Sequence, residues 1–407
     1  MPETGSENRK KIVLIGPVYP FKGGISHYTG LLCRALRERY DVSMISYSMQ
    51  YPKLLFRREQ RDFSNDSFKI EDTDFILNTA SIKSIKATAK RINEIAPELT
   101  VLQWWHPYFA PCYQMLARRL KSKVLFICHN VFPHERFPLD RWLTKRTLRR
   151  GDFFVLHSSK EASDLRSIVK NAKYRVNMHP TYSEFKRVET ESGAVPVDQA
   201  SVLLFFGFVR AYKGLKVLIQ AMASIPEIVH LNIVGDFDGT KDEYSRMIEE
   251  LHLTDRISIR DGYVPDREVG EYFERCDAVV LPYLDATQSG IAQIAFGFEK
   301  PVIATNVGGL PEVVIDGETG VLCEAGDPDS LKDAIQRFFE LKKTVDFAEN
   351  IRNDAPRFSW EHLVDTIEEL TEHDTVSART LGGYGISPER CKSDNKLALL
   401  EEKIWII

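Results

Sequence analysis

The chain has 407 residues, of which 43% are hydrophobic and 28% charged, and this composition is ordinary for a globular protein of two domains. No stretch holds the roughly 18 uninterrupted apolar residues of a membrane span, and the polar first residues, MPETGSENRKK, lack the pattern of a signal or transit peptide. The six cysteines are scattered without a CxxC pair, so we expect a reduced cytoplasmic protein without a zinc site.

The net charge of −4 hides two unlike halves. Residues 1–185 hold 31 Lys and Arg against 18 Asp and Glu, a net charge of +13, and the remainder holds 23 basic and 40 acidic residues, a net charge of −17. A basic half should face an anionic partner, and we expect an anionic membrane surface, met by the basic helix predicted at 139–150. The same helix could instead pack its apolar stripe on the core. We expect no nucleic acid, because the basic residues lie on dispersed helices without interleaved aromatic residues.

The first half predicts alternating strands and helices. Apolar runs indicate strands at 10–15, 42–47, 99–103, 123–128, 152–156 and 176–178, and helical spacing indicates helices at 26–39, 83–95, 111–120, 139–150 and 160–169. Ser26 is the expected N-cap of the first helix. Gly23 and Gly24 stand just before it without the GxGxxG spacing, so they form either a phosphate-approaching loop or a plain turn.

His129 directly follows the strand at 123–128. Ligands of open α/β sheets bind at the carboxyl ends of the strands, so His129 is a candidate for contact with a sugar hydroxyl or a phosphate. A structural histidine bonded to a neighbouring loop is the alternative.

The polar segment 186–200, KRVETESGAVPVDQA, reads as a linker, and the charge balance changes sign near it. The second half then predicts strands at 202–206, 231–234, 257–260, 278–281 and 301–304, and helices at 215–223, 244–251, 266–273, 291–298, 330–341 and 360–370. Asp266 is a candidate N-cap. The tail 374–407 remains unassigned.

Two loops of the second half have the chemistry to hold a diphosphate. Arg210 and Lys213 follow the strand at 202–206, and their charges could neutralise a departing diphosphate or simply be solvated. The turn Thr287-Gln288-Ser289-Gly290 leads into the helix at 291–298. Backbone N–H groups of Ser289, Gly290 and Ile291 could therefore hold a phosphate at a helix N-terminus.

Three segments resemble glycosyltransferase family 4: HNVFPHE at 129–135, FGFVRAYKGLKVLIQAM at 206–222 and KPVIATNVGGLPEVVIDGETGVL at 300–322. The resemblance covers roughly residues 10–370. It implies a retaining enzyme with the α/β GT-B architecture, in which two Rossmann-like domains with parallel sheets face each other across a cleft. The implied parts are an acceptor-binding domain at 1–185, the linker 186–200, a nucleotide-sugar-binding domain at 201–357, a crossover helix at 358–373 and the unassigned tail.

The resemblance also implies roles for single residues. Gly23 and Gly24 would approach the donor phosphate, and His129 would lie near the transferred sugar. Lys213 matches the family's diphosphate-binding lysine. Val264 would contact the nucleotide base through its backbone.

This chain departs from the family at three positions. The family arginine that precedes the lysine falls on Phe208, so we assign its role to Arg210. The two glutamates that usually contact the sugar and the ribose fall on Ala286 and Ile294, in a variant turn that reads Gln-Ser-Gly. Either Gln288 or Gln293 could bond to the sugar or ribose hydroxyls in their place.

The resulting hypothesis is transfer of a hexose from a UDP- or GDP-linked nucleotide-sugar to a saccharide acceptor, lipid-linked or of the cell envelope. We expect no metal and no other cofactor, because Asp236-Phe237-Asp238 matches a D-x-D motif in its letters only. The enzyme would be cytoplasmic and peripheral at the inner face of the membrane. The alternatives are a non-catalytic nucleotide- or glycan-binding GT-B protein and a nucleotide-sugar epimerase.

Overall fold

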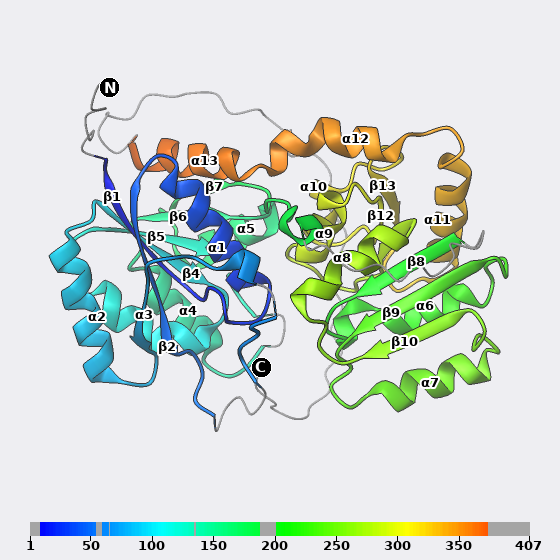
Figure 1. Ribbon diagram of the computed structural model, residues 1–407, viewed down its shortest axis with the longest axis horizontal. Coiled ribbons are helices and arrows are strands. Elements are labelled where there is room, and N and C mark those ends of the chain that lie inside the picture. The colour runs from blue at the N-terminus through cyan, green and yellow to red at the C-terminus, as the bar shows by residue number, and fades with distance from the viewer. Residues whose placement is uncertain (1–8, 54–58, 65, 134–135, 188–200, 373–407) are drawn as a thin grey trace.

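The computed structural model describes residues 9–53, 59–64, 66–133, 136–187 and 201–372. Most of the predicted linker 186–200 and the whole tail 374–407 lie outside these residues. Within the described chain, two parallel sheets lie side by side, each covered by helices (Figure 1). The predicted α/β class with two parallel sheets is confirmed.

The first sheet has seven strands among the described residues, in the order β3-β2-β1-β4-β5-β6-β7, and all neighbouring pairs are parallel. The central strands are buried along almost their whole length, which explains their continuous apolar sequences. The bounds are β1 Lys11–Ile15, β2 Asp41–Met49, β3 Thr73–Asn78, β4 Leu99–Trp104, β5 Lys123–Cys128, β6 Phe153–Leu156 and β7 Lys173–Val176.

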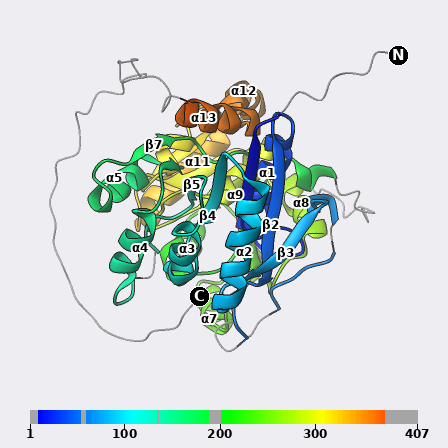
Figure 2. The ribbon, with the colours of Figure 1, turned by 90° about the vertical axis from the view of Figure 1, so that its left-hand side faces the viewer.

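Helices cover both faces of this sheet (Figure 2). One face packs against α2 (Ile82–Ile95), α3 (Ala110–Ala117), α4 (Asp140–Leu148) and α5 (Ser159–Ile168). The other packs against α1 (Gly24–Arg37) and α13 (Trp360–Glu372). The last described helix of the chain therefore completes the core of the first domain, and it occupies the segment where the sequence predicts a crossover helix.

The second sheet has six strands in the described chain, in the order β10-β9-β8-β11-β12-β13, again all parallel. The strands are β8 Ser201–Phe206, β9 Val229–Gly235, β10 Ile257–Asp261, β11 Ala278–Leu281, β12 Val302–Thr305 and β13 Gly320–Cys323. Helices α6 (Leu215–Met222), α7 (Lys241–Glu250) and α11 (Pro328–Leu341) cover one face. The other face meets α8 (Asp266–Arg275), α9 (Gly290–Gly297), α10 (Leu310–Val313) and α12 (Phe347–Asp354).

Both predicted N-caps are wrong. Gly23 is the N-cap of α1, and Ser26 lies inside the helix with a buried hydroxyl that has no partner. Pro265 is the N-cap of α8, and Asp266 is its first residue. The Asp266 carboxylate instead bonds to the other domain. No helix of the described residues is both long and apolar enough to cross a membrane.

Candidate active site

Two helices, one in each domain, begin at glycine-bearing turns. α1 follows Gly23, whose φ is 98°, and α9 follows Ser289, whose hydroxyl accepts from the N–H of Ala292. A Cβ atom added to Gly23, Gly24 or Gly290 would meet no heavy atom within 4 Å. Both helix N-termini therefore border open space. Their first N–H groups have no partner inside the helix and attract anions.

Tyr182 connects the starts of these helices. Its hydroxyl donates to the carbonyl of Gly24 at 3.2 Å, and its N–H donates to the carbonyl of Gln293 at 3.4 Å. A Cβ atom on Gly297 would lie 2.4 Å from the Tyr182 carbonyl oxygen, so only glycine allows this close approach. Tyr182 thus fixes α1 relative to α9. Sequence analysis missed it, because it lies in an irregular segment without any motif.

Lys213 is a buried cation on the loop after β8. Its side chain is 8% exposed, and its Nζ lies 5.7 Å from the centre of the Tyr283 ring. In the described part of the chain, no carboxylate forms an ion pair with it. Burial, helped by the nearby charge of Arg210, lowers the pKa of Lys213 to about 8. A desolvated charge without a counter-ion is costly, so this position favours an anionic ligand.

Lys213 also lies close to the start of α9. A Cβ atom on Gly207 would lie 3.1 Å from the Lys213 Nζ and 3.6 Å from the Cδ1 of Ile291. Gly207, with φ of 102°, therefore lets the lysine and the first turn of α9 approach the same point. The structure brings together the two loops that the sequence predicted to hold a diphosphate.

Arg210 is held by an aspartate. Its Nη1 donates to the Oδ2 of Asp238 at 2.8 Å, while the Oδ1 of Asp236 accepts from the N–H of Asp238 at 2.8 Å. The aspartates of the Asp-Phe-Asp sequence therefore shape a turn and position Arg210. The described residues contain no group of three His, Cys, Asp or Glu side chains placed to hold a metal ion.

The side chains of the α9 turn point largely into the protein. Gln293 is 1% exposed, and its Oε1 is buried without a partner, as is the Oε1 of Gln288. The positions where the family usually has glutamates, Ala286 and Ile294, are 1% and 9% exposed and pack in the core. The groups of this turn that remain available to an anion are thus its backbone N–H groups.

His129 lies beneath the boundary between the domains. It is 2% exposed, and its Nε2 lies 2.7 Å from the Oε1 of Gln103. The ring of Tyr28 packs edge-on against it, with centroids 4.5 Å apart. Burial, and then the neighbouring His157 and His179, hold the pKa of His129 well below its usual value. The imidazole is therefore neutral, and with Gln103 Oε1 as the acceptor its Nε2 carries the proton.

The residue after His129 reaches the second domain. The hydroxyl of Thr287, in the α9 turn, donates to the Oδ1 of Asn130 at 2.6 Å. Close by, the N–H of Ser159 donates to the carboxylate of Glu312, with 3.1 Å to each oxygen. The carboxyl ends of β5 and β6 thus contact the α9 turn and α10 directly.

Val264, the predicted base contact, is 7% exposed and adjoins a polar cluster that joins the domains. The Oδ2 of Asp266 lies 2.7 Å from the Nε2 of His27. The Tyr263 hydroxyl donates to the Oδ2 of Asp62 at 2.8 Å. These bonds tie α1 and the loop after β2 to the residues on both sides of Val264. Because the two pairs are 239 and 201 residues apart in sequence, no local pattern could have predicted them.

Glu161, in α5, is bonded to His157, the residue that directly follows β6 in the first sheet. It is fully buried, and its Oε2 accepts from the N–H of His157 at 3.1 Å, while its Oε1 has no partner. Burial raises the pKa of Glu161 to about 8. The carboxyl group is therefore mostly protonated at neutral pH, and sequence analysis did not single it out.

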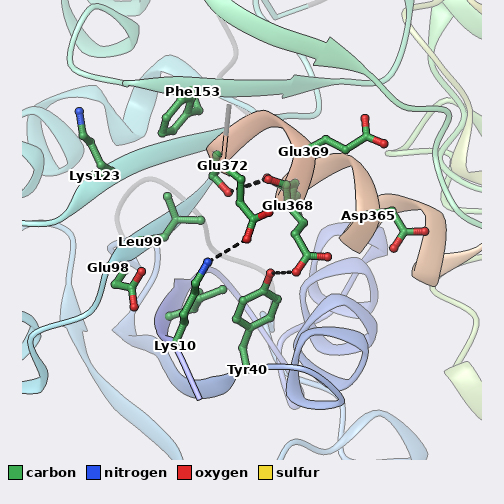
Figure 3. Close-up of a pocket in the computed structure, with 13 residues that line it drawn as sticks. Lys10, Tyr40, Glu98, Leu99, Lys123, Phe153, Asp365, Glu368, Glu369 and Glu372 are labelled. Atoms are coloured by element: carbon green, nitrogen blue, oxygen red, sulfur yellow. Dashed lines mark hydrogen bonds and ion pairs between the residues drawn. The ribbon is translucent and has the colours of Figure 1, made fainter. Parts of the chain in front are cut away.

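A cavity of about 910 Å³ lies away from this region, between α13 and the amino ends of β1, β4, β5 and β6 (Figure 3). Two of the carboxylates that line it are bonded to other lining residues. Lys10 Nζ lies 2.8 Å from Glu372 Oε1, and the Tyr40 hydroxyl donates to Glu368 at 2.9 Å. Parallel sheets bind ligands at the opposite, carboxyl ends of their strands, so we assign this cavity to the packing of α13.

Comparisons with known proteins give the family. The model of Glycosyltransferase Family 4 matches residues 22–177, and the model of glycosyl transferases group 1 matches residues 189–375. An uncharacterised glycosyltransferase of Methanocaldococcus jannaschii is 32% identical over 374 residues, which are 89% of this chain and 98% of that protein. The chain belongs to glycosyltransferase family 4.

Other proteins match this glycosyltransferase in sequence over part of their length, or share its fold. A D-inositol 3-phosphate glycosyltransferase of Paenarthrobacter aurescens is 30% identical over 178 residues, 42% of this chain and 43% of that protein. The structure of HepE from Anabaena, in complex with UDP and glucose, has a TM-score of 0.67 at 18% identity and covers 90% of this chain and 99% of its own. This likeness shows the GT-B fold. As a family member, the glycosyltransferase takes its sugar from a nucleotide-sugar.

Proposed function

We propose that this glycosyltransferase moves a hexose, with retention of configuration and without a metal ion, from a UDP- or GDP-linked donor to a saccharide acceptor that is lipid-linked or belongs to the cell envelope. The observation that carries the proposal is Lys213, a buried cation without a carboxylate partner in the described chain, close to the start of α9. The diphosphate of a nucleotide-sugar supplies the missing counter-charge.

In this proposal the catalytic groups act on the leaving diphosphate. Its negative charge grows as the bond to the sugar breaks, and Lys213 and Arg210 neutralise it. The N–H groups of Ser289, Gly290 and Ile291 bind the same phosphates without needing a side chain. The acceptor hydroxyl attacks on the face that the diphosphate leaves and gives its proton to that diphosphate, so the bond to the acceptor replaces the bond to the phosphate.

Other residues position the donor. Gly23 and Gly24 bring the start of α1 to the phosphate from the first domain, as the open space beside both residues allows. Neutral His129 lies near the sugar, and Val264 contacts the base through its backbone. The variant turn lacks carboxylates, so an amide, of Gln288 or Gln293, bonds to the sugar or ribose hydroxyls.

Independence from metal rests on two observations. Lys213, which has no carboxylate partner in the described chain, and two helix N-termini already supply positive charge. The Asp238 carboxylate that a D-x-D motif would offer to a metal is bonded to Arg210. We also propose that the protein works on the cytoplasmic side of a membrane and touches its anionic inner face. The net charge of +13 on residues 1–185 supports this location.

Two assays test the proposal. Melting temperatures are first measured with UDP, GDP, ADP and their sugars, because a ligand that binds only the folded state raises the melting temperature. A radiolabelled transfer assay with the stabilising donor is then run with and without EDTA. We expect stabilisation by a uridine or guanosine diphosphate sugar and equal transfer in both buffers. Transfer that stops with EDTA and returns with Mn²⁺ would contradict metal independence.

A second candidate function is binding of nucleotide or glycan without catalysis. The absence of carboxylates at Ala286 and Ile294, both packed in the core, favours it. In that case donors would raise the melting temperature, yet neither transfer nor release of free sugar would be detected. Release of an isomerised sugar without any acceptor would instead identify an epimerase.

A further inference from the structure

The charge excess of the first domain is concentrated on the layer formed by α2, α3, α4 and the residues that follow them. We call residues 82–96, 110–122 and 140–150 the basic layer. It contains twelve Lys and Arg and only two acids, Glu94 and Asp140. The basic residues are Lys83, Lys86, Lys90, Arg91, Arg118, Arg119, Lys121, Arg141, Lys145, Arg146, Arg149 and Arg150.

Internal pairing neutralises little of this charge. Asp140 is 4% exposed and is bonded to Arg136, outside the layer. The Oε1 of Glu94 lies 3.8 Å from the Nζ of Lys90. Most of the other cations are exposed, and among the described residues Lys83, Arg149 and Arg150 form no ion pair. The three helices lie next to one another on one face of the sheet (Figure 2), so their charges combine into a single positive surface.

Exposed apolar side chains mark one edge of the basic layer. Ile82 is 58% exposed, Leu139 69% and Trp142 53%. Leu139 is the N-cap of α4 with φ of 74°, a conformation that is unfavourable for leucine. Its side chain is largely unburied, so burial inside the protein does not explain a leucine there. The ring of Trp142 lies 5.1 Å from the guanidinium of Arg146, which combines an apolar group with a cation at one site.

The parallel order of the strands shows at which end of the helices these exposed apolar side chains lie. Every strand of the sheet is parallel, so helices that follow a strand begin at its carboxyl end. α2 and α4 therefore begin at the edge where Asn130 and Ser159 contact the second domain. The apolar residues stand at this same edge, and the cations continue to the far ends of the helices.

We propose that the basic layer docks on an anionic lipid surface, with Leu139 and Trp142 entering the headgroup region. Phospholipid phosphates neutralise the cations, and the interface accommodates the leucine and the amphipathic indole. Docked in this way, the first domain rests on the bilayer through the face of its sheet that α2, α3 and α4 cover. The inference rests on the proposed function, because docking would give the enzyme access to a lipid-linked acceptor. Nucleic acid is disfavoured, because Trp142 is the one exposed aromatic residue in the basic layer.

Vesicle co-sedimentation tests the docking. The full chain is incubated at about 0.1 M salt with vesicles of phosphatidylcholine alone or with 30% phosphatidylglycerol. We expect binding to the anionic vesicles only. The triple variant Arg146→Gln, Arg149→Gln and Arg150→Gln should bind about 100-fold more weakly. Each basic residue near the surface contributes about 1 kcal/mol, which is roughly a fivefold change in affinity. A matched triple variant of the second domain, Lys241→Gln, Arg246→Gln and Lys343→Gln, loses the same charge and should bind like the wild type.

Two further measurements separate the possible outcomes. Tryptophan fluorescence should shift to the blue on anionic vesicles, and Trp142→Phe should remove the shift. The proposal is overturned by absence of binding, by equal loss in the two triple variants, or by tighter binding to duplex RNA with the same sensitivity to the substitutions. Thermal shift with the nucleotide-sugar is recorded on each variant. If no nucleotide-sugar raises the melting temperature of the wild type, the proposed function is refuted, and the docking result still stands.

Discussion

The two domains place groups of different charge at the candidate active site. On the second domain, Lys213 and the start of α9 offer positive groups without a counter-charge in the described chain. On the first domain, His129, His157 and His179 surround Tyr28 as buried rings whose pKa values are all lowered. The first arrangement lowers the stability of the folded protein, and in the proposed function a bound anion offsets this cost. The second keeps a fixed shape by remaining neutral.

Removing the lysine should produce the largest effect. In Lys213→Met a side chain of similar length replaces the cation, so the charge stabilising the diphosphate is lost while the site stays filled. We expect transfer to fall by at least about 100-fold and the melting temperature to stay equal or rise, because an unpaired buried charge disappears. Lys213→Arg serves as the charge-retaining control. Near-normal turnover of the Met variant would remove Lys213 from the site.

The histidine cluster should make the protein sensitive to acid. Burial lowers the pKa of His157 from 6.5 to about 4 and that of His179 to about 3. The unfolded chain therefore binds more protons than the folded one in this range, and stability present above pH 6.5 is lost as the pH falls through the folded values. For His157 alone the loss between pH 7 and pH 4.5 is on the order of 2 kcal/mol.

Urea unfolding between pH 7 and pH 4.5 measures this loss. His157→Gln should lower stability at pH 7 and flatten its dependence on pH. The slope is the diagnostic quantity, since any core substitution can lower the stability itself. An unchanged slope in the variant would show that His157 is already accessible to protons in the folded state.

Glu161 should give a pH dependence of opposite sign, which is smaller than that of His157 and His179 together. Its pKa rises from 4.5 to about 8 on folding, so the folded state binds the extra proton, and its contribution to stability is lost as the pH rises through about 8. Glu161→Gln keeps an oxygen for the N–H of His157 and cannot ionise. We expect the variant to gain on the order of 3 kcal/mol over the wild type between pH 5.5 and pH 8.

Paired thermal or urea unfolding curves at the two pH values measure this gain. Comparing variant and wild type at each pH cancels the contribution of the histidines. A variant that is less stable than the wild type by the same amount at both pH values would mean that the Glu161 proton is not retained at pH 8.

The sequence predicts most of the fold, because strands, glycine turns and helices are encoded by neighbouring residues. The central strands and the α9 turn were predicted from apolar runs that end in glycine-containing turns. β3 was missed because it is an edge strand with a largely exposed pattern, and β13 because it starts with Gly320 and has an apolar run of only Val-Leu-Cys. Ser26 and Asp266 were assigned as caps from residue type alone, and the structure gives them other surroundings.

The candidate site was predictable where backbone groups and loop motifs form it. Lys213 and Ser289-Gly290 were predicted from such motifs, and in the structure Lys213 and Ile291, in the first turn of α9, both lie beside Gly207. Tyr182, Gln103 and Glu161 could not be found, because their partners are far along the chain or are backbone groups. The buried state of His129 was also unpredictable, since Tyr28 and the other two histidines create it from distant segments.

The return of α13 to the first domain also affects synthesis of the protein. Leu363, Val364, Ile367 and Leu370 fill the core beside α1, and they leave the ribosome after both sheets have been translated. The domain that is made first is therefore finished last. Until these residues emerge, the nascent chain exposes an apolar face of its first sheet, and a chaperone that shields this face would prevent aggregation.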